Sequence, residues 1–512
     1  MTARCVMVLG TSSGAGKSWL ATALCRHYAQ QGLKVAPFKA QNMSNNARVV
    51  PAAEGRMGEI GSAQYFQALA ARAVPDVRMN PLLLKPEADT HSQVVLMGQV
   101  SRELTALPWR GRSAHVWPQI AAALDALRTE HDVVVIEGAG SPAEINLMDS
   151  DVVNLRVARH ADARCLLVAD IDRGGAFAHL YGTWALLPEG DRARIAGFVL
   201  NKFRGDASLL APAPEQLQAL TGVPTVAVVP MRFGHGLPEE DGVFDAAATQ
   251  AHAPLQAESA ASALPTGGGS YGNDSETVPR RIAVIAYPRI SNLDEFQPLK
   301  NVPGVTLTWA RTPAALHGAD TVILPGSKAT AADLAWLRAQ GLDAAIAQHA
   351  ARGGRVLGIC GGLQMLGEAL IDLHGVESLG NAPGLGLLPL VTSFEPDKTL
   401  RRTQARFGDV AGAWSALSGV AAVGYEIHAG QTAQHPAMAA QGDVARDVVP
   451  GLAWQNAAGN VLGVYLHGLF EDAAVLHALF GARAPSLDAV FDGLAAEIER
   501  AFAPGALASL IG

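Results

Sequence analysis

The sequence has little of what marks secreted, zinc-binding, membrane-spanning or nucleic-acid-binding proteins. Its 512 residues include four cysteines and no CxxC pair, which argues against disulfides or zinc and favours a reducing cytoplasm. No apolar run approaches the ~20 residues that a membrane helix needs, and the N-terminal run CVMVLG is too short for a signal peptide. A net charge of −8 gives no sign of a polyanion-binding surface, so nucleic acid is not an expected partner. The lack of a long apolar run means that a membrane is not expected either.

The chain does have length and a repeated strand-helix rhythm. It is too long for one ordinary core, so at least two domains are expected. Short β-branched runs that alternate with helical patterns predict a parallel sheet buried on both faces. In the first part these runs are CVMVLG, LKVAPF, DVVVIEGAG, ARCLLVADI, IAGFVLN and PTVAVVP. In the second part they are RIAVIAY, TLTWA, DTVILPG, RVLGIC and NVLGVYLHG.

These patterns predict two α/β domains, at residues 1–244 and 280–475. Between them, residues 245–279 are rich in Ala, Ser, Gly and Pro and hold almost no large apolar residue. Such a segment cannot bury enough apolar surface to offset the entropy of ordering, so we expect a disordered linker. The tail, residues 476–512, is predicted to form one or two helices that cover the second domain.

The first domain opens with a phosphate-loop pattern, VMVLGTSSGAGKSWLATAL. The order strand, glycine-rich loop, Lys-Ser and helix lets backbone N–H groups cradle the phosphates of ATP. Gly14 and Gly16 provide the turn, Lys17 is expected on the β- and γ-phosphates, and Ser18 on Mg²⁺. Thr11 replaces the first glycine of the strict pattern. A Gly/Ser-rich turn without a ligand is the alternative.

Polar residues after later strands are further candidates, because open α/β sheets bind ligands at the carboxyl ends of their strands. Glu137 ends the run DVVVIEGAG and is predicted to bind Mg²⁺. Lys39, in APFKAQNMSNNA, is predicted to contact substrate or phosphate. Asp172 is a candidate metal ligand, and Arg173 a candidate for a substrate carboxylate. The alternatives are a strand-end glutamate, a plain loop and structural ion pairs.

The second domain contains an isolated cysteine between glycines. In RVLGICGGLQMLGEAL, Cys360 lies between Gly358 and Gly362, where a strand pattern changes to a helix pattern. Glycines are needed there if the chain makes a sharp strand-to-helix turn that presents a nucleophile. The N-terminus of the following helix favours the thiolate. A buried structural cysteine is the alternative.

Partners for this nucleophile are found at the ends of neighbouring strands. His467, at the end of NVLGVYLHG, is the predicted base. The N–H groups of Gly326, in VILPGSKAT, and of Gly361 are predicted to form an oxyanion hole.

Each half resembles a known family. Three features resemble dethiobiotin synthetase and its relatives, in which ATP phosphorylates a carboxylate: the phosphate loop with Thr11 in place of its first glycine, the stretch EGAG, and Lys39 after the second strand. The resemblance implies that Asn201 reads the adenine. The glycine-flanked turn at Cys360, together with His467, resembles the nucleophile elbow and histidine of the class I glutamine amidotransferases, which have a flavodoxin-like α/β domain. Their usual triad has a Glu two residues after the histidine, where this chain has Leu469. Glu471 or another carboxylate is left to orient His467.

Nearly the whole chain resembles the cobyric acid synthase family. The motifs that carry this resemblance are GTSSGAGKS, PFKAQNMSNNA, ADIDRGGAFA, NKFRGD, PRISNLDEF, LPGSKAT, GYEIHAG and YLHGLFED, in that order. The resemblance implies a glutamine-hydrolysing amide ligase that uses ATP, Mg²⁺ and glutamine. Its small-molecule corrinoid substrate would be adenosylcobyrinic acid a,c-diamide, with four carboxylates (b, d, e and g) amidated in cobalamin biosynthesis.

Two alternatives stay open at this point. A cobyrinic acid a,c-diamide synthase would have similar domains, although AQNMSNNA speaks against it. A non-catalytic switch ATPase with a degenerate glutaminase domain is disfavoured by the intact pair of Cys360 and His467. The sequence leaves the oligomeric state and the order of amidations undefined.

Overall fold

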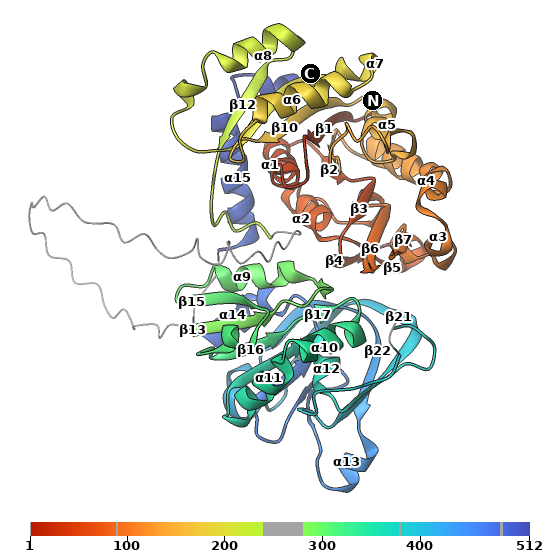
Figure 1. The fold of residues 1–512 in the computed structure, drawn as a ribbon, viewed down its shortest axis with the longest axis vertical. Coiled ribbons are helices and arrows are strands. Elements are labelled where there is room, and N and C mark those ends of the chain that lie inside the picture. Colours follow the sequence, from red (N-terminus) through yellow and green to blue (C-terminus); the bar gives the residue numbers. More distant parts are fainter. Residues whose placement is uncertain (1, 89–90, 239–279, 378–379, 482–484) are drawn as a thin grey trace, which may run out of the picture.

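Two α/β halves lie one above the other in the computed structural model (Figure 1). It describes residues 2–88, 91–238, 280–377, 380–481 and 485–512. The predicted linker, residues 245–279, lies outside the described residues. Both halves have a central sheet with helices on its faces, as the alternating apolar runs predict.

The first half is built on a six-stranded parallel sheet of order β12-β11-β10-β1-β9-β2. Its strands are β1 (Arg4–Gly10), β2 (Val35–Phe38), β9 (Val133–Glu137), β10 (Arg164–Asp170), β11 (Ile195–Phe203) and β12 (Thr225–Pro230). The main helices are α1 (Lys17–Gln30), α4 (Trp109–Glu130), α5 (Leu155–Ala161), α6 (Ala176–Leu186) and α8 (Ala213–Thr221). The carboxyl ends of β1 and β9 lie side by side, which brings the phosphate loop next to Glu137.

A mostly antiparallel unit, residues 41–100, is inserted after β2 and was not predicted. It contains the sheet β3-β6-β7-β8 and the hairpin β4-β5, followed by helix α2 (Ser62–Ala70). Its strands are β3 (Gln41–Met43), β4 (Ala47–Pro51), β5 (Met57–Gly61), β6 (Leu82–Ala88), β7 (His91–Leu96) and β8 (Gln99–Val100). This inserted unit reaches from the edge of the first sheet to the second half of the molecule (Figure 1).

The second half has a seven-stranded sheet of order β15-β13-β16-β18-β25-β24-β23. Its strands are β13 (Arg280–Ile285), β15 (Val305–Ala310), β16 (Thr321–Leu324), β18 (Arg355–Ile359), β23 (Arg446–Val449), β24 (Ala453–Gln455) and β25 (Val461–Val464). Its helices include α10 (Thr330–Ala339), α11 (Leu342–Ala351), α12 (Gly361–Leu366) and α14 (Ala473–Phe480). The five predicted strands form the parallel part, and β23 and β24 extend it antiparallel.

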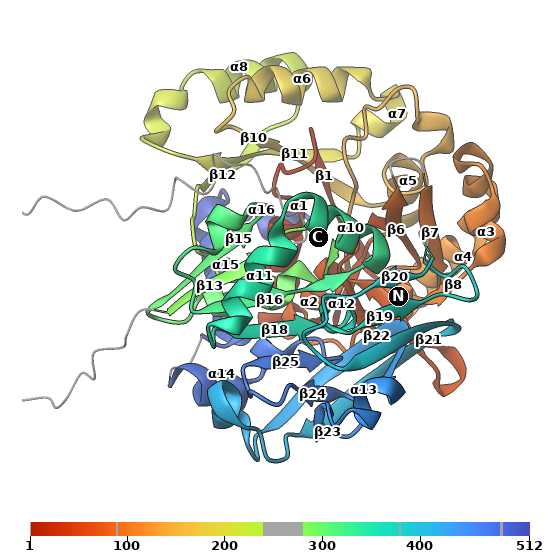
Figure 2. The same cartoon turned by 60° about the horizontal axis from the view of Figure 1, so that its bottom comes forward.

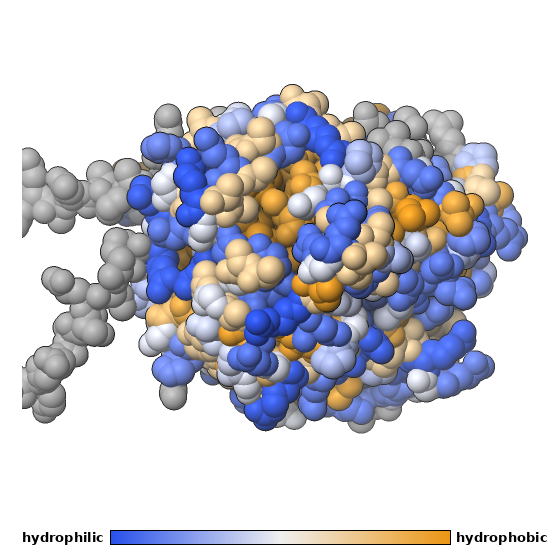
Figure 3. All heavy atoms as spheres, turned by 90° about the horizontal axis from the view of Figure 1, so that it is seen from below, coloured by the Kyte–Doolittle hydropathy of each residue, from blue (hydrophilic) through white to orange (hydrophobic). Residues whose placement is uncertain are grey.

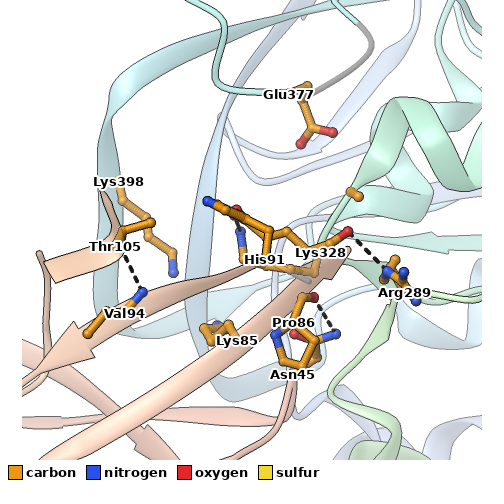
Figure 4. Close-up of polar contacts among 12 residues, drawn as sticks. Asn45, Lys85, Pro86, His91, Val94, Thr105, Arg289, Lys328, Glu377 and Lys398 are labelled. Atoms are coloured by element: carbon orange, nitrogen blue, oxygen red, sulfur yellow. Dashed lines mark hydrogen bonds and ion pairs between the residues drawn. The ribbon is translucent and has the colours of Figure 1, made fainter. Parts of the chain in front are cut away.

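A long hairpin extends from the second half to the inserted unit. It consists of β21 (Leu390–Arg406) and β22 (Ala421–Gln434), and both Figure 1 and Figure 2 place it beside strands of that unit. Lys398 of β21 donates to Glu59 Oε1 at 2.7 Å, and Lys85 donates to Glu59 Oε2 at 2.8 Å. Nearby, Lys328 donates to Glu87 at 2.6 Å (Figure 4). Charged side chains from both halves therefore pair across the junction.

The C-terminal tail does not cover the second domain, so this prediction was wrong. Helix α15 (Leu487–Ala501) packs on α1, and residues Phe491, Leu494 and Ile498 belong to the core of the first half. Figure 1 shows the blue α15 alongside the red α1. The amphipathic helix α15 packs its apolar face on a side of α1 that would otherwise be exposed. Tyr28 of α1 also donates to the carbonyl of Leu507. Only α14 at the start of the tail stays on the second half.

The described helices and one face of the surface can be compared with what a membrane-spanning segment requires. Among the described residues, no helix combines the length and the apolar character needed to cross a bilayer. Viewed from the end of the second half, hydrophilic residues cover much of the face and apolar residues form separate groups (Figure 3).

We expect Phe491→Ala to loosen the first half of the molecule. Phe491 is buried against α1 with the Arg26 guanidinium 5.6 Å from its ring centre, and removal of such a side chain costs about 3–5 kcal/mol. Hydrogen exchange should therefore rise in α1 and stay unchanged in α11. Leu220→Ala, at an exposed position of α8, is the control and should change stability by less than about 0.5 kcal/mol. Loss of protection in α11 instead of α1 would contradict this packing.

Candidate functional site

The phosphate loop joins β1 to α1 in the geometry that its sequence requires. Gly16 has φ 97°, and a Cβ atom there would lie 1.9 Å from Asn201 Nδ2. The Lys17 ammonium donates to the carbonyls of Ser12 (2.9 Å) and Gly140 (3.1 Å), so it lies over the loop. A left-handed glycine followed by a helix N-terminus can present N–H groups to an anion.

Glu137 is the polar centre of this site. Its Oε1 accepts hydrogen bonds from Ser18 Oγ and Lys39 Nζ, each at 2.8 Å, and its Oε2 accepts one from Gln67 Nε2 at 2.6 Å. Burial would raise the pKa of Glu137, but the Lys39 ammonium and the hydrogen bonds lower it below its usual value. The carboxylate is therefore held ionised beside a hydroxyl, and oxygen donors of this kind suit Mg²⁺.

The other predicted residues of the first half lie around the loop. Asn201 donates to the Ala15 carbonyl at 2.8 Å, so it borders the phosphate loop. Asp172 pairs with Arg204, and Arg173 lies 3.7 Å from Asp170 with an exposed side chain. The structure thus brings Ser18, Lys39 and Glu137 together, while Asp172 and Arg173 form separate ion pairs. Their proposed metal and substrate roles stay predictions.

Sequence reasoning missed two residues of this site. Gln67 belongs to the inserted unit, and nothing in the sequence of α2 distinguishes it. Lys202 follows Asn201 in the quoted NKFRGD and donates to the Gly14 carbonyl at 2.7 Å and to Asp170 at 2.9 Å. Its place beside Asn201 could have indicated it.

In the second half, Cys360 lies on the sharp turn between β18 and α12. Its backbone has φ 50° and ψ −105°, a strained conformation for a residue with a side chain. A Cβ atom on Gly358 would lie 2.7 Å from backbone atoms of Gly362, and one on Gly362 would lie 1.9 Å from the Leu324 carbonyl. The flanking glycines are therefore required by close backbone packing, as predicted for a nucleophile elbow.

His467 is held between the nucleophile and a carboxylate. It interacts electrostatically with Cys360, whose thiol donates to the Ile427 carbonyl at 3.6 Å. Its Nδ1 lies 3.2 Å from Oε1 of the fully buried Glu295. The imidazole also stacks on Tyr425, with ring centres 5.4 Å apart. Burial would lower the pKa of His467, but the charges of Glu295 and Cys360 raise it to about 10. The geometry is that of a Cys-His-Glu triad, in which the acid orients the base.

Glu295, and not Glu471, is the carboxylate that contacts His467. Oε2 of Glu295 also accepts the Gly468 N–H at 3.0 Å, whereas Glu471 lies 2.6 Å from Arg48. The acid thus comes from the quoted stretch PRISNLDEF, far from the histidine in sequence. In the usual triad the glutamate stands two residues after the histidine, so sequence spacing alone does not identify Glu295 as the triad acid.

The two glycines of the predicted oxyanion hole border the triad. Gly326 lies in β17 (Gly326–Ser327), which pairs with β14 (Ile290–Ser291). A Cβ atom on Gly326 would lie 2.9 Å from His467 Cε1, and one on Gly361 would lie 2.7 Å from the Ser327 nitrogen. Only glycine leaves this space clear, and the oxyanion role itself stays a prediction.

The loop that carries Glu295 is bound by the inserted unit of the first half. Asn292 donates to the Ala47 carbonyl at 2.9 Å, and the Leu293 N–H donates to Asn46 Oδ1 at 2.9 Å. The guanidinium of Arg48 pairs with Asp294, the residue directly before Glu295. The first half therefore contributes to the position of the triad acid.

Comparisons with known proteins agree with this architecture. Residues 6–241 match the model of the CobQ/CobB/MinD/ParA nucleotide binding domain, and residues 281–475 match that of the CobB/CobQ-like glutamine amidotransferase domain. The chain is 75% identical to a cobyric acid synthase of Acidovorax ebreus (strain TPSY), over 100% of this chain and 99% of that protein. It is 74% identical to one of Variovorax paradoxus (strain S110), over 100% of both chains, and 65% identical to one of Leptothrix cholodnii (strain ATCC 51168 / LMG 8142 / SP-6), over 99% of this chain and 97% of that protein. With identity this high over its full length, the chain belongs to the cobyric acid synthase family.

Proposed function

We propose that this protein is a cytoplasmic amide ligase that makes cobyric acid, with ATP and glutamine as co-substrates. It would amidate the b, d, e and g carboxylates of adenosylcobyrinic acid a,c-diamide, a small-molecule corrinoid of cobalamin biosynthesis. The observation that carries this proposal is that one chain contains both a Cys-His-Glu triad and a phosphate loop with the Lys39–Glu137 ion pair beside it. The full-length identity to cobyric acid synthases supports the choice of substrate.

In the glutaminase half, Cys360 is the proposed nucleophile for the side-chain amide of glutamine. His467 holds the thiol proton as an imidazolium beside the thiolate and gives it to the leaving nitrogen, so ammonia departs and a thioester remains. Glu295 holds the imidazole in place and stabilises its protonated form. The N–H groups of Gly326 and Gly361 would stabilise the oxyanion. Water then hydrolyses the thioester and releases glutamate.

In the synthetase half, Lys17 is proposed to bind the β- and γ-phosphates of ATP while Asn201 reads the adenine. A substrate carboxylate attacks the γ-phosphate to give an acyl phosphate, and ammonia then displaces phosphate to form the amide. Ser18 and Glu137 would hold Mg²⁺, which neutralises phosphate charge when bound. Lys39, which pairs with Glu137, would stabilise the anionic groups of the reaction.

The activity is tested directly with purified protein, adenosylcobyrinic acid a,c-diamide, ATP, Mg²⁺ and glutamine. Mass spectrometry should detect stepwise replacement of OH by NH₂ up to the tetra-amide. Absence of any amide product, with glutamine or with ammonium as donor, would overturn the proposal.

We expect Cys360→Ala to abolish glutamine-dependent amidation and to retain amidation at high ammonium concentration. Ammonia enters the reaction after the thioester step, so the synthetase half does not need the thiol. Both rates are measured by product mass spectrometry on the same sample. Glutamine use at the wild-type rate would rule out Cys360 as the nucleophile.

The Glu295→Gln variant should lower glutamine-dependent turnover by about 10²-fold or more, the scale of impaired general-base catalysis. Its loss also removes the carboxylate that favours the imidazolium, so the pKa of His467 should fall from about 10. An NMR titration of the histidine C–H signals measures this shift, which a purely structural defect would not produce. Glu471→Gln is the comparison variant. A larger loss for Glu471→Gln than for Glu295→Gln would contradict the assignment.

Lys17→Ala should remove amidation with either nitrogen donor, because no acyl phosphate can form. Hydrolysis of glutamine should persist, since Cys360 and His467 lie in the other half. Glutamate release and amide formation are quantified side by side. Ammonium-dependent synthesis by Lys17→Ala would refute the phosphate role.

A further inference from the structure

Helix α2 buries the residues that an ordinary surface helix exposes. Ser62, Gln64 and Gln67 are completely buried, whereas Tyr65 and Leu69 are partly exposed. Polar side chains of a short amphipathic helix normally face solvent. Burial of two glutamines loses solvation free energy unless hydrogen bonds compensate for it.

Helix α2 contacts residues at or next to both candidate sites. Ser62, at its first turn, donates to Asp294, which precedes the triad acid Glu295. Gln67 donates to Glu137 beside the phosphate loop. Ser62 and Gln67 are five residues apart, and at 1.5 Å per residue the helix covers roughly 7.5 Å between these contacts. It therefore connects the segment that carries the triad acid to the carboxylate beside the phosphate loop.

Part of this buried polar surface has no partner. Within the described part of the chain, both amide atoms of Gln64 and Oε1 of Gln67 are buried without a hydrogen bond. Gln64 and Gln67 are three residues apart and so lie on the same face of the helix. Buried amide groups of native proteins almost always have partners, so unpaired ones indicate a small polar guest.

We propose that these amides of α2 bind ammonia on its way from Cys360 to the acyl phosphate. The inference rests on the proposed function, which requires ammonia to pass from one half to the other. Ammonia has three N–H donors and a lone pair, which match the amide oxygens and the N–H₂ group of Gln64. It passes as the neutral molecule, because an ammonium ion would be costly to bury there. No bond is made or broken during this passage.

The test is an isotope competition with Gln64→Leu, which keeps the side-chain bulk and removes both amide atoms. The reaction contains glutamine labelled with ¹⁵N in its side-chain amide and unlabelled ammonium in the medium. Wild-type product should carry ¹⁵N, because transferred ammonia does not mix with solvent. For Gln64→Leu we expect the ratio of amide formed to glutamine hydrolysed to fall about five-fold, on the scale of one lost hydrogen-bonding partner. Unlabelled nitrogen should then enter the product.

Glu87→Gln is the matched control, because it weakens the ion pair with Lys328 between the halves and leaves the residues of α2 unchanged. It should transfer label like wild type. Gln64→Met is a second variant of similar shape, so that a folding defect in one does not decide the result. Amidation with ammonium as the only nitrogen donor measures the activity of the synthetase half separately. If wild type formed no amide from ammonium, the result would count against the proposed function.

Two results would overturn the proposal. One is full label transfer by Gln64→Leu and Gln64→Met, which would mean that Gln64 holds a structural water only. The other is unlabelled product from wild type, which would mean that ammonia passes through solvent, while the amide ligase activity itself would stand.

Discussion

The buried ion pair between Arg48 and Asp294 fixes how the two halves meet. Both side chains are almost completely buried, and the guanidinium also contacts Glu471 and the ring of Tyr425. Removal of one partner from such a pair costs about 3–5 kcal/mol, because the other charge stays buried and unpaired. The halves therefore have one strongly preferred relative orientation. Since Asp294 directly precedes Glu295, this orientation also sets the geometry of the triad.

A similar charge constraint operates at the phosphate site. Glu137 stays ionised in a buried position because Lys39, Ser18 and Gln67 supply its donors. Two of these donors, Lys39 and Gln67, come from the segment that follows β2 and from the inserted unit. The inserted unit is thus tied to both sites: through Gln67 to the phosphate loop and through Arg48 to the glutaminase. Neither site is complete within its own sheet.

The sequence was most informative where function depends on local geometry. Parallel strands were predicted from continuous apolar runs, and the turn at Cys360 from its glycines, because both constraints act over a few neighbouring residues. Glu295 was missed because it meets His467 only after two distant segments have packed together. The inserted unit was missed because its short strands pair antiparallel and leave weak periodicity. The tail was assigned to the wrong half because an amphipathic helix does not specify which surface it covers.

The path of the chain adds a second constraint on the relative orientation of the two halves, beside the ion pair of Arg48. After completing the glutaminase sheet, the chain returns to the first half, where Phe491 packs on α1 and Phe502 pairs with Ala227 of β12. The glutaminase is therefore inserted between two parts of the synthetase and does not hang from its end. The packing of the tail on the first half restricts the rotation of the glutaminase, and a short transfer between two sites needs that restriction. Because the surrounding structure keeps both ends of α2 in place, a helix as short as α2 is sufficient to connect the two sites.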